Sequence, residues 1–199
     1  MRIISGKAGG IRLQAPDGDS LRPTEDRVKE ALFASLGDLQ GLRVLDLFSG
    51  SGSLGLEALS RGAAEVIMVE KNPQHLRYIE KNLAAVLKSM QSEAGESRVL
   101  LADVRQVPQL LPELAEKIDL LLADPPYKPL PGSFGGRELL LSQEFASWCA
   151  PHIRFILEHE SSSELPWFPQ SPWRLERQKQ FGRRTISWLH LERRGQAAV

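Results

Sequence analysis

One hydrophobic run that ends on an acid and then breaks into three glycines constrains this chain more than any other stretch. The run covers residues 44–47 and includes Asp46, and a helical pattern follows the glycines. The glycines have the spacing G-x-G-x-x-G: Gly50, Gly52 and Gly55. In such a pattern the first glycines let the backbone turn tightly and approach a ligand, and the last lets a helix pack closely on a strand. The stretch predicts a parallel strand that delivers a cofactor to a glycine turn, although a turn without a ligand has the same pattern.

Asp46 favours one class of cofactor over another. It stands four positions before Gly50, where a dinucleotide site would place a pyrophosphate, and a carboxylate there would repel that group. A ligand with a cationic end is favoured instead. S-adenosyl-L-methionine fits this requirement, because it carries an ammonium group and a sulfonium and has no phosphate.

From residue 42 onward, short hydrophobic runs alternate with helical patterns, which is typical of a parallel sheet covered on both faces. We expect strands at residues 44–47, 65–70, 98–101, 118–124 and 153–159, and helices at residues 54–59, 73–90, 107–114 and 139–148. Two later segments alternate apolar and polar residues on either side of a glycine, and they predict an antiparallel hairpin at residues 173–177 and 185–191. The expected fold is α/β, with a mostly parallel seven-stranded sheet that ends in this C-terminal antiparallel hairpin.

The start of the chain is interpreted as a small extension. Residues 2–6 and 10–13 are spaced to pair as short strands across a turn. Thr24 is expected to be the N-cap of a following helix. The predicted organisation is an N-terminal extension, residues 1–40, packed on a domain formed by residues 41–199.

Acids stand at the ends of four predicted strands: Asp46, Glu70, Asp103 and Asp124. Because the carboxyl ends of parallel strands meet at one edge of a sheet, we expect these acids to share a ligand site. Glu70 could accept hydrogen bonds from ribose hydroxyls, and Asp103 could accept one from the adenine amino group with Val104 stacked on the ring. Asp46 would hold the methionine end. Each acid taken alone could equally cap a helix or close a strand.

The segment Asp124-Pro125-Pro126-Tyr127 indicates chemistry on an amino group. The two prolines fix an extended backbone, so that the Asp124 carboxylate and the Pro125 carbonyl can face one amine. The amine of a nucleobase is a poor nucleophile, and two acceptors would favour the pyramidal form and take up positive charge as a new bond forms. Tyr127 could stack on the base. A proline-stiffened turn is the alternative interpretation.

Charge gives only a local argument for nucleic acid. The 25 basic and 25 acidic residues give a net charge of zero, so the whole chain exerts no general attraction on phosphates. Cations gather near both ends: Arg2, Lys7 and Arg12 at the start, and Arg183 and Arg184 near the end. Such clusters could contact RNA phosphates, although solvated surfaces carry the same pattern.

Composition also excludes several classes of site. The single Cys149 rules out an internal disulfide, and the four histidines show no paired ligand spacing, so no metal is expected. No apolar segment is long enough for a signal peptide or a membrane span, and we expect a cytoplasmic protein.

These motifs resemble the class I S-adenosylmethionine-dependent methyltransferases with a D-P-P-Y motif. The chain is similar, more narrowly, to the RsmD family of bacterial 16S rRNA guanine-N2 methyltransferases. The likeness covers residues 2–6, 21–24, 26–33, 46–63, 124–127 and 181–185. It implies a Rossmann-like fold and methyl transfer to N2 of a guanine in 16S rRNA. The RNA would be held in a small ribosomal subunit or its assembly intermediate, and the enzyme would be a monomer without a metal.

The resemblance also assigns residues to three groups. The catalytic group is Asp124, Pro125, Pro126 and Tyr127. The cofactor-binding group is Asp46, Phe48, Gly50, Gly52, Glu70, Lys71, Asp103 and Val104, with Arg22 and Thr24 near both cofactor and substrate. The RNA-binding group is Arg2, Lys7, Arg12, Arg27, Arg183 and Arg184.

Other functions remain open at this stage. The same chemistry could act on adenine N6 of DNA or RNA, or on a protein amide, for which asparagine would be more usual at position 124. An NAD-dependent oxidoreductase is suggested by the glycine pattern with Glu70 about twenty residues on, as in dinucleotide sites, but it leaves Asp46 and residues 124–127 unexplained. A noncatalytic RNA-binding module would not need the acids.

Overall fold

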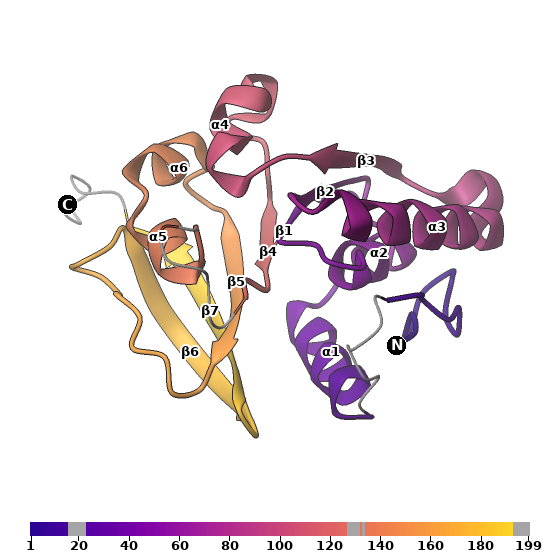
Figure 1. Ribbon diagram of the computed structural model, residues 1–199, viewed down its shortest axis with the longest axis horizontal. Helices are drawn as coiled ribbons and strands as arrows, with labels where there is room; N and C mark the ends of the chain where they lie inside the picture. The colour runs from indigo at the N-terminus through magenta and orange to yellow at the C-terminus, as the bar shows by residue number, and fades with distance from the viewer. Residues whose placement is uncertain (16–22, 127–131, 133, 193–199) are drawn as a thin grey trace. The chain divides into compact units, whose positions relative to one another are not determined.

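The computed structural model describes residues 1–15, 23–126, 132 and 134–192. The chain forms two compact units, unit 1 from Met1 to Asp103 and unit 2 from Val104 to Val199, and each is described by itself (Figure 1). The boundary predicted near residue 40 lies inside unit 1 and stays a prediction. Within the described residues no helix is both long and apolar enough to cross a membrane.

Unit 1 is built on three parallel strands in the order β3-β2-β1. Its elements are α1 (Pro23–Leu36), β1 (Arg43–Leu47), α2 (Ser53–Ser60), β2 (Glu65–Glu70), α3 (Pro73–Met90), η1 (Gln91–Glu93) and β3 (Glu96–Leu101). The central strand β2 has the sequence EVIMVE and is buried along its whole length. Such a continuous apolar run is typical of a parallel strand covered on both faces.

Helices α2 and α3 connect the three strands of unit 1. The helix α3 begins as the sequence predicts, because the Asn72 side chain accepts a hydrogen bond from the Gln74 amide at 2.9 Å and Pro73 occupies the first turn. It buries Ile79, Val86 and Met90 on one face. The amphipathic pattern therefore places α3 on the sheet with its charged face outward.

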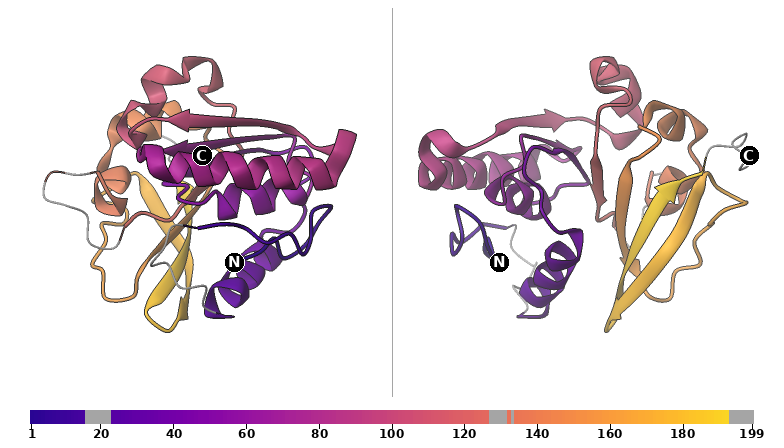
Figure 2. Two further views of the ribbon diagram at one scale, coloured as in Figure 1. Left: turned by 45° about the vertical axis from the view of Figure 1, so that its right-hand side comes forward. Right: turned by 180° about the vertical axis from the view of Figure 1, so that it is seen from behind.

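The first fifteen residues, called the arm below, form a short hairpin in unit 1 (Figure 2). Arg2 and Arg12 form an antiparallel bridge, and the Ile3 amide donates to the Ile11 carbonyl at 2.9 Å. The pairing expected between residues 2–6 and 10–13 is thus present, reduced to a bridge. The helix α1 begins at Pro23, so the prediction that Thr24 is its N-cap is wrong. Proline suits the first helical position, since it lacks an amide hydrogen and has a fixed φ.

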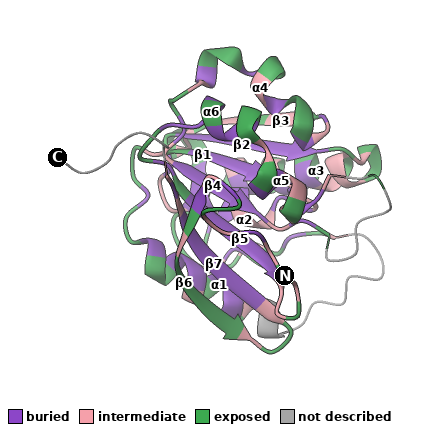
Figure 3. Ribbon diagram, turned by 90° about the vertical axis from the view of Figure 1, so that its left-hand side faces the viewer, coloured by how far each residue is buried: buried purple, intermediate pink, exposed green. Residues whose placement is uncertain are grey.

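Unit 2 carries four strands in the order β4-β5-β7-β6. Its elements are η2 (Val104–Gln106), α4 (Val107–Leu110), η3 (Pro112–Leu114), β4 (Leu120–Ala123), α5 (Gly136–Leu141), α6 (Gln143–Trp148), β5 (Arg154–Glu160), β6 (Trp173–Phe181) and β7 (Arg184–Leu191). The strands β4 and β5 are parallel, whereas β7 runs antiparallel to both β5 and β6. Strand β7 is mostly buried and β6 mostly exposed, as Figure 3 shows.

The fold class predicted from the sequence is confirmed. The described residues contain seven strands, mostly parallel, and the chain ends in an antiparallel hairpin. Strand β2 has the predicted bounds, and the other strands differ at their ends. The hairpin strands are longer than expected because they pair up to the two-residue turn at Gly182 and Arg183, where Gly182 has φ 62°.

Two predicted helices are interrupted. The helix expected over residues 107–114 is divided into α4 and the 3₁₀ turn η3, because Pro112 cannot continue the hydrogen bonding of a helix. The helix expected over residues 139–148 is divided into α5 and α6. Ser142 separates them, and its hydroxyl caps α6 by accepting the Phe145 amide at 3.2 Å.

Candidate active site

Asp46 lies inside β1 with 1% of its surface exposed. Its Oδ2 atom accepts the amide hydrogen of Gly55 at 2.9 Å. Burial is the main cause that raises the pKa of this carboxyl group from 3.8 to about 7; the charge of Glu70 adds to it, and hydrogen bonds from Gly55 and Ser49 oppose it. Asp46 is therefore a group that changes charge near neutral pH.

The glycine turn reverses the chain between β1 and α2 through three residues with positive φ: Phe48 at 58°, Gly50 at 57° and Gly52 at 79°. Around Gly50 there is open space, since an added Cβ would meet only the Phe48 carbonyl at 3.9 Å. At Gly55 an added Cβ would lie 2.8 Å from Met68 Cγ. Gly50 is thus the point where a ligand has access, and Gly55 allows helix α2 to pack closely on β2.

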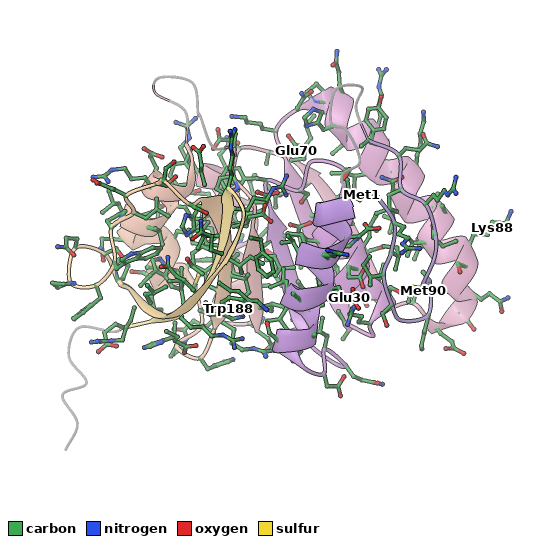
Figure 4. The ribbon with its side chains drawn as sticks, turned by 90° about the horizontal axis from the view of Figure 1, so that it is seen from below. Met1, Glu30, Glu70, Lys88, Met90 and Trp188 are labelled. Atoms are coloured by element: carbon green, nitrogen blue, oxygen red, sulfur yellow. The ribbon has the colours of Figure 1, made fainter. Side chains whose placement is uncertain are left out.

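Glu70, labelled in Figure 4, is the last residue of β2, and its carboxylate holds the glycine turn in place. Its Oε2 atom accepts the Gly50 amide at 2.8 Å, and its Oε1 atom accepts the Asn72 amide at 2.7 Å. The side chain is buried, at 7% exposure. Because each carboxylate oxygen has two lone pairs, each keeps one acceptor position for a ligand hydroxyl.

The other predicted residues of unit 1 lie at the same ends of its strands. The Ala102 amide donates to the Glu70 carbonyl at 3.0 Å, which sets Asp103 just beyond the pairing of β2 with β3. Asp103 is half-buried and Lys71 is exposed. Unit 1 therefore brings three of the four predicted acids to the carboxyl ends of neighbouring strands.

The predicted residues of unit 2 are Val104 and the segment after β4. Val104 is buried at the start of η2. Asp124 is half-buried, Pro125 is buried and Pro126 is exposed. An added Cβ at Gly136 would lie 3.1 Å from Pro125 Cγ, so this glycine allows the start of α5 to pack on the proline. Tyr127 and Arg22 lie outside the described residues, and of Thr24 only its place in α1 is described.

The predicted RNA-binding cations differ in their surroundings. Three of them form ion pairs: Arg2 with Asp26 at 3.2 Å, Lys7 with Glu93 at 2.7 Å, and Arg184 with Glu158 at 2.9 Å. The other three, Arg12, Arg27 and Arg183, are exposed. Half of the predicted RNA-binding cations therefore already have a carboxylate partner within the chain.

Comparison with known proteins identifies the family. A sequence model of the family described as Conserved hypothetical protein 95 matches residues 1–190. The Ribosomal RNA small subunit methyltransferase D of Escherichia coli K12 is 33% identical over 198 residues, which cover 99% of this chain and 93% of that protein. This chain belongs to the RsmD family.

Solved structures agree with membership of the RsmD family. A hypothetical protein of Thermus thermophilus matches with a TM-score of 0.73 and 26% identity, over 97% of this chain and 99% of that chain. The putative methyltransferase yhhF of Escherichia coli matches with a TM-score of 0.65 and 30% identity, over 98% and 99%. The fold of the RsmD-family chain is thus the Rossmann-like fold expected from its sequence.

One cluster of this RsmD-family chain was missed by the sequence analysis. Glu57 is fully buried in α2, and its carboxylate accepts the Ile4 amide at 2.7 Å and the Ser5 amide at 3.1 Å. It also pairs with Lys29 at 3.4 Å and with Arg61 at 2.8 Å. The detectable signal was a lone acid inside the otherwise apolar helix SLGLEALS. The cluster fastens the arm to the helix that follows the glycine turn.

Proposed function

We propose that this chain transfers a methyl group from S-adenosylmethionine to the exocyclic N2 amine of a guanine in small-subunit rRNA. The observation that carries the proposal is the buried acid pair Asp46 and Glu70 at the glycine turn, in a chain whose relatives are named ribosomal RNA small subunit methyltransferase D. An enzyme that acts on rRNA would work in the cytoplasm, and this location stays a prediction.

The residues of unit 1 fit S-adenosylmethionine in three respects. Asp46 is a carboxylate above about pH 7 and would attract the ligand's ammonium group. Glu70 has acceptor positions left for ribose hydroxyls, and the open side of Gly50 leaves room for the ligand to approach the backbone. Asp103 and Val104 are assigned to the adenine, and Phe48 and Lys71 are assigned to the edge of the cofactor site. When bound, the ligand would supply an electrophilic methyl group on a sulfonium.

The acceptor amine is assigned to Asp124 and the Pro125 carbonyl. Both would accept hydrogen bonds from the amine, which orients its lone pair and removes solvent from it. Asp124 would also stabilise the positive charge that develops on the amine nitrogen. An ordinary carboxylate, with a pKa of about 4, is too weak a base to deprotonate a nucleobase amine, so the proton would leave only after the new bond forms. Tyr127 is assigned to stacking on the base.

Calorimetry tests the part of the proposal that concerns the methyl donor. We expect S-adenosylmethionine to bind and NAD not to bind. Glu70→Gln keeps the size of the side chain but should weaken S-adenosylmethionine binding at least tenfold, because it loses the charge that holds the turn and the ribose. Glu80→Gln, on the exposed face of α3, is the matched control and should bind normally. NAD binding without S-adenosylmethionine binding would overturn the proposal.

A methyl-transfer assay tests the part of the proposal that concerns the acceptor amine. Small subunits from a strain that lacks this protein are incubated with radiolabelled S-adenosylmethionine, and the methylated nucleotide is mapped by mass spectrometry. Asp124→Ala should lower turnover about 10²–10³-fold, since one transition-state contact is lost, while cofactor binding stays within twofold of the wild type. Methylation at adenine N6, or loss of cofactor binding with turnover spared, would contradict the assigned roles.

A further inference from the structure

Two buried side chains connect the arm to residues on either side of Gly52. The first is Asn82 in α3, which is 2% exposed. Its Oδ1 atom accepts the Gln14 amide at 2.8 Å, and its Nδ2 atom donates to the Gln14 carbonyl at 2.8 Å. The same Nδ2 atom donates to the Ser51 carbonyl at 2.9 Å. One amide therefore joins the end of the arm to the glycine turn.

The second connection is Lys29 in α1, which is 5% exposed. Its Nζ atom donates to the Arg2 carbonyl at 2.5 Å and to the Ser53 hydroxyl at 3.0 Å, and it lies 3.4 Å from the Glu57 carboxylate. An ammonium group has three hydrogens, so all three are used. Lys29 thus joins the beginning of the arm to the first residue of α2.

These contacts lie on either side of Gly52, where the glycine turn leads into α2. Gly52 has φ 79°, donates its amide to the Ser49 carbonyl at 2.7 Å and precedes the first residue of α2. Its neighbours Ser51 and Ser53 are each hydrogen-bonded to a nitrogen atom, Asn82 Nδ2 or Lys29 Nζ, that also donates to a backbone carbonyl of the arm. Because Asn82 and Lys29 are themselves buried, displacing the arm would leave the Asn82 amide and the Lys29 ammonium group with unused hydrogen-bonding positions beside the turn.

We propose that Asn82 and Lys29 are positioning residues that couple the arm to the cofactor turn, so that S-adenosylmethionine and rRNA each increase the affinity for the other. The inference rests on the proposed function, in which the arm contacts RNA and the turn contacts the cofactor. A ligand that orders the turn orders the arm through these contacts, and by linkage RNA on the arm orders the turn to the same degree.

The coupling is measured as the ratio of two dissociation constants for S-adenosylhomocysteine, a ligand that cannot react. One is measured with the free protein and the other with saturating unmethylated small subunits. For the wild type we expect a ratio of about five or more, the lower end of typical coupling between sites. Asn82→Ala removes one of the two connections and should reduce the ratio by more than twofold, while kcat at saturating substrates stays within about twofold because the residue does not contact the reacting atoms.

Ser60→Ala is the matched control. Ser60 is 1% exposed, and its hydroxyl holds the arm by two hydrogen bonds, accepting the Ala8 amide at 2.9 Å and donating to the Ser5 carbonyl at 2.7 Å. Neither bond reaches the glycine turn. This variant loosens the arm to a similar extent, so its coupling ratio should stay within twofold of the wild type.

A second variant reaches the same contact from the exposed side. Gln14→Pro removes the amide hydrogen that Asn82 accepts, at an exposed residue outside the helices and strands. Gln14→Pro should also reduce the coupling ratio. It replaces Asn82→Ala as the test if that variant shows no cooperative melting and is therefore not folded.

A wild-type ratio of one, an unchanged ratio in the folded Asn82 or Gln14 variants, or an equal loss in Ser60→Ala would each overturn the coupling. A wild type that binds neither S-adenosylhomocysteine nor small subunits would instead contradict the proposed function.

Discussion

The carboxyl group of Asp46 gives cofactor binding a definite pH dependence. With its pKa raised to about 7 by burial, Asp46 is neutral below that pH and carries a charge above it. The affinity for S-adenosylmethionine should therefore rise with pH, by about tenfold between pH 6 and pH 8, in step with the ionised fraction. Below pH 7 the bound ammonium group should also release a proton from Asp46, which calorimetry in buffers of different ionisation enthalpy detects.

Asp46→Asn is the control for this prediction. The amide can still accept the Gly55 hydrogen bond through its oxygen, but it has no charge to gain. Binding should be weak and flat between pH 6 and pH 8. A wild-type affinity that does not change over this range would show that Asp46 does not hold the cationic end of the ligand.

The predicted and unpredicted residues of the site differ in the kind of partner they have. Asp46 and Glu70 follow apolar runs, and their positions at strand ends were predictable because strand direction fixes them. The second role of Glu70, as acceptor for the Gly50 amide, was not. Glu57 and Asn82 were also missed, since they bind backbone groups of the arm more than fifty residues away. Backbone amides and carbonyls are the same in every residue, so the sequence carries no sign of such contacts.

At the scale of elements, the arm is held by its backbone on helix α2. Glu57→Gln should test the strength of this attachment. The substitution leaves the Lys29 ammonium group without its buried carboxylate, and breaking such a pair costs about 3–5 kcal/mol of unfolding free energy. The midpoint of thermal unfolding should fall by roughly 6–20 °C for a chain of this size.

The control is an ion pair of the arm that is exposed. Lys7 and Glu93 lie 2.7 Å apart, and both side chains are largely open to solvent. Glu93→Gln should leave the unfolding midpoint unchanged, because exposed pairs are screened by water. Equal shifts in the two variants would mean that the buried network of Glu57 does not stabilise the fold.

Two glycines of the arm allow a second test of the same attachment. Gly6 and Gly10 have nearly equal φ, 84° and 89°. A Cβ at Gly6 would lie 2.0 Å from the Ser60 carbonyl oxygen, whereas a Cβ at Gly10 would meet nothing within 4 Å. Alanine at either position introduces similar backbone strain, of order 1 kcal/mol. Only Gly6→Ala should also displace the arm, which hydrogen exchange of the Ile4 and Ser5 amides would report as lost protection.

The sequence predicts elements best where one period holds without interruption. The apolar run of β2 and the capped amphipathic α3 were found with correct starts. The helix expected over residues 107–114 was wrong in extent, because its apolar spacing was given more weight than Pro112. The start of α1 was misplaced by two residues, because Thr24 as a cap was given more weight than Pro23 as the first helical residue. Local backbone chemistry overrides side-chain periodicity at such points.

For the whole molecule, charge neutrality predicts a preference among RNA substrates. The net charge is zero, and Arg2, Lys7 and Arg184 are already paired with carboxylates of the chain. Without an excess of positive charge on the chain, binding to bare RNA should be weak and should depend little on salt. We expect methyl transfer to assembled small subunits to be at least tenfold faster than to protein-free 16S rRNA at equal concentration. Equal initial rates would show that recognition needs RNA alone.

The attachment of the arm also sets an order of events during synthesis. The arm leaves the ribosome before the groups that hold it, which lie far along the chain: Glu57 and Ser60 on α2, and Asn82 on α3. Since a chain is made from its amino terminus, the arm cannot dock before α2 has been made, and its attachment is complete only after α3. The segment proposed to meet the ribosomal RNA is thus translated before the residues of α2 and α3 that fix it in place.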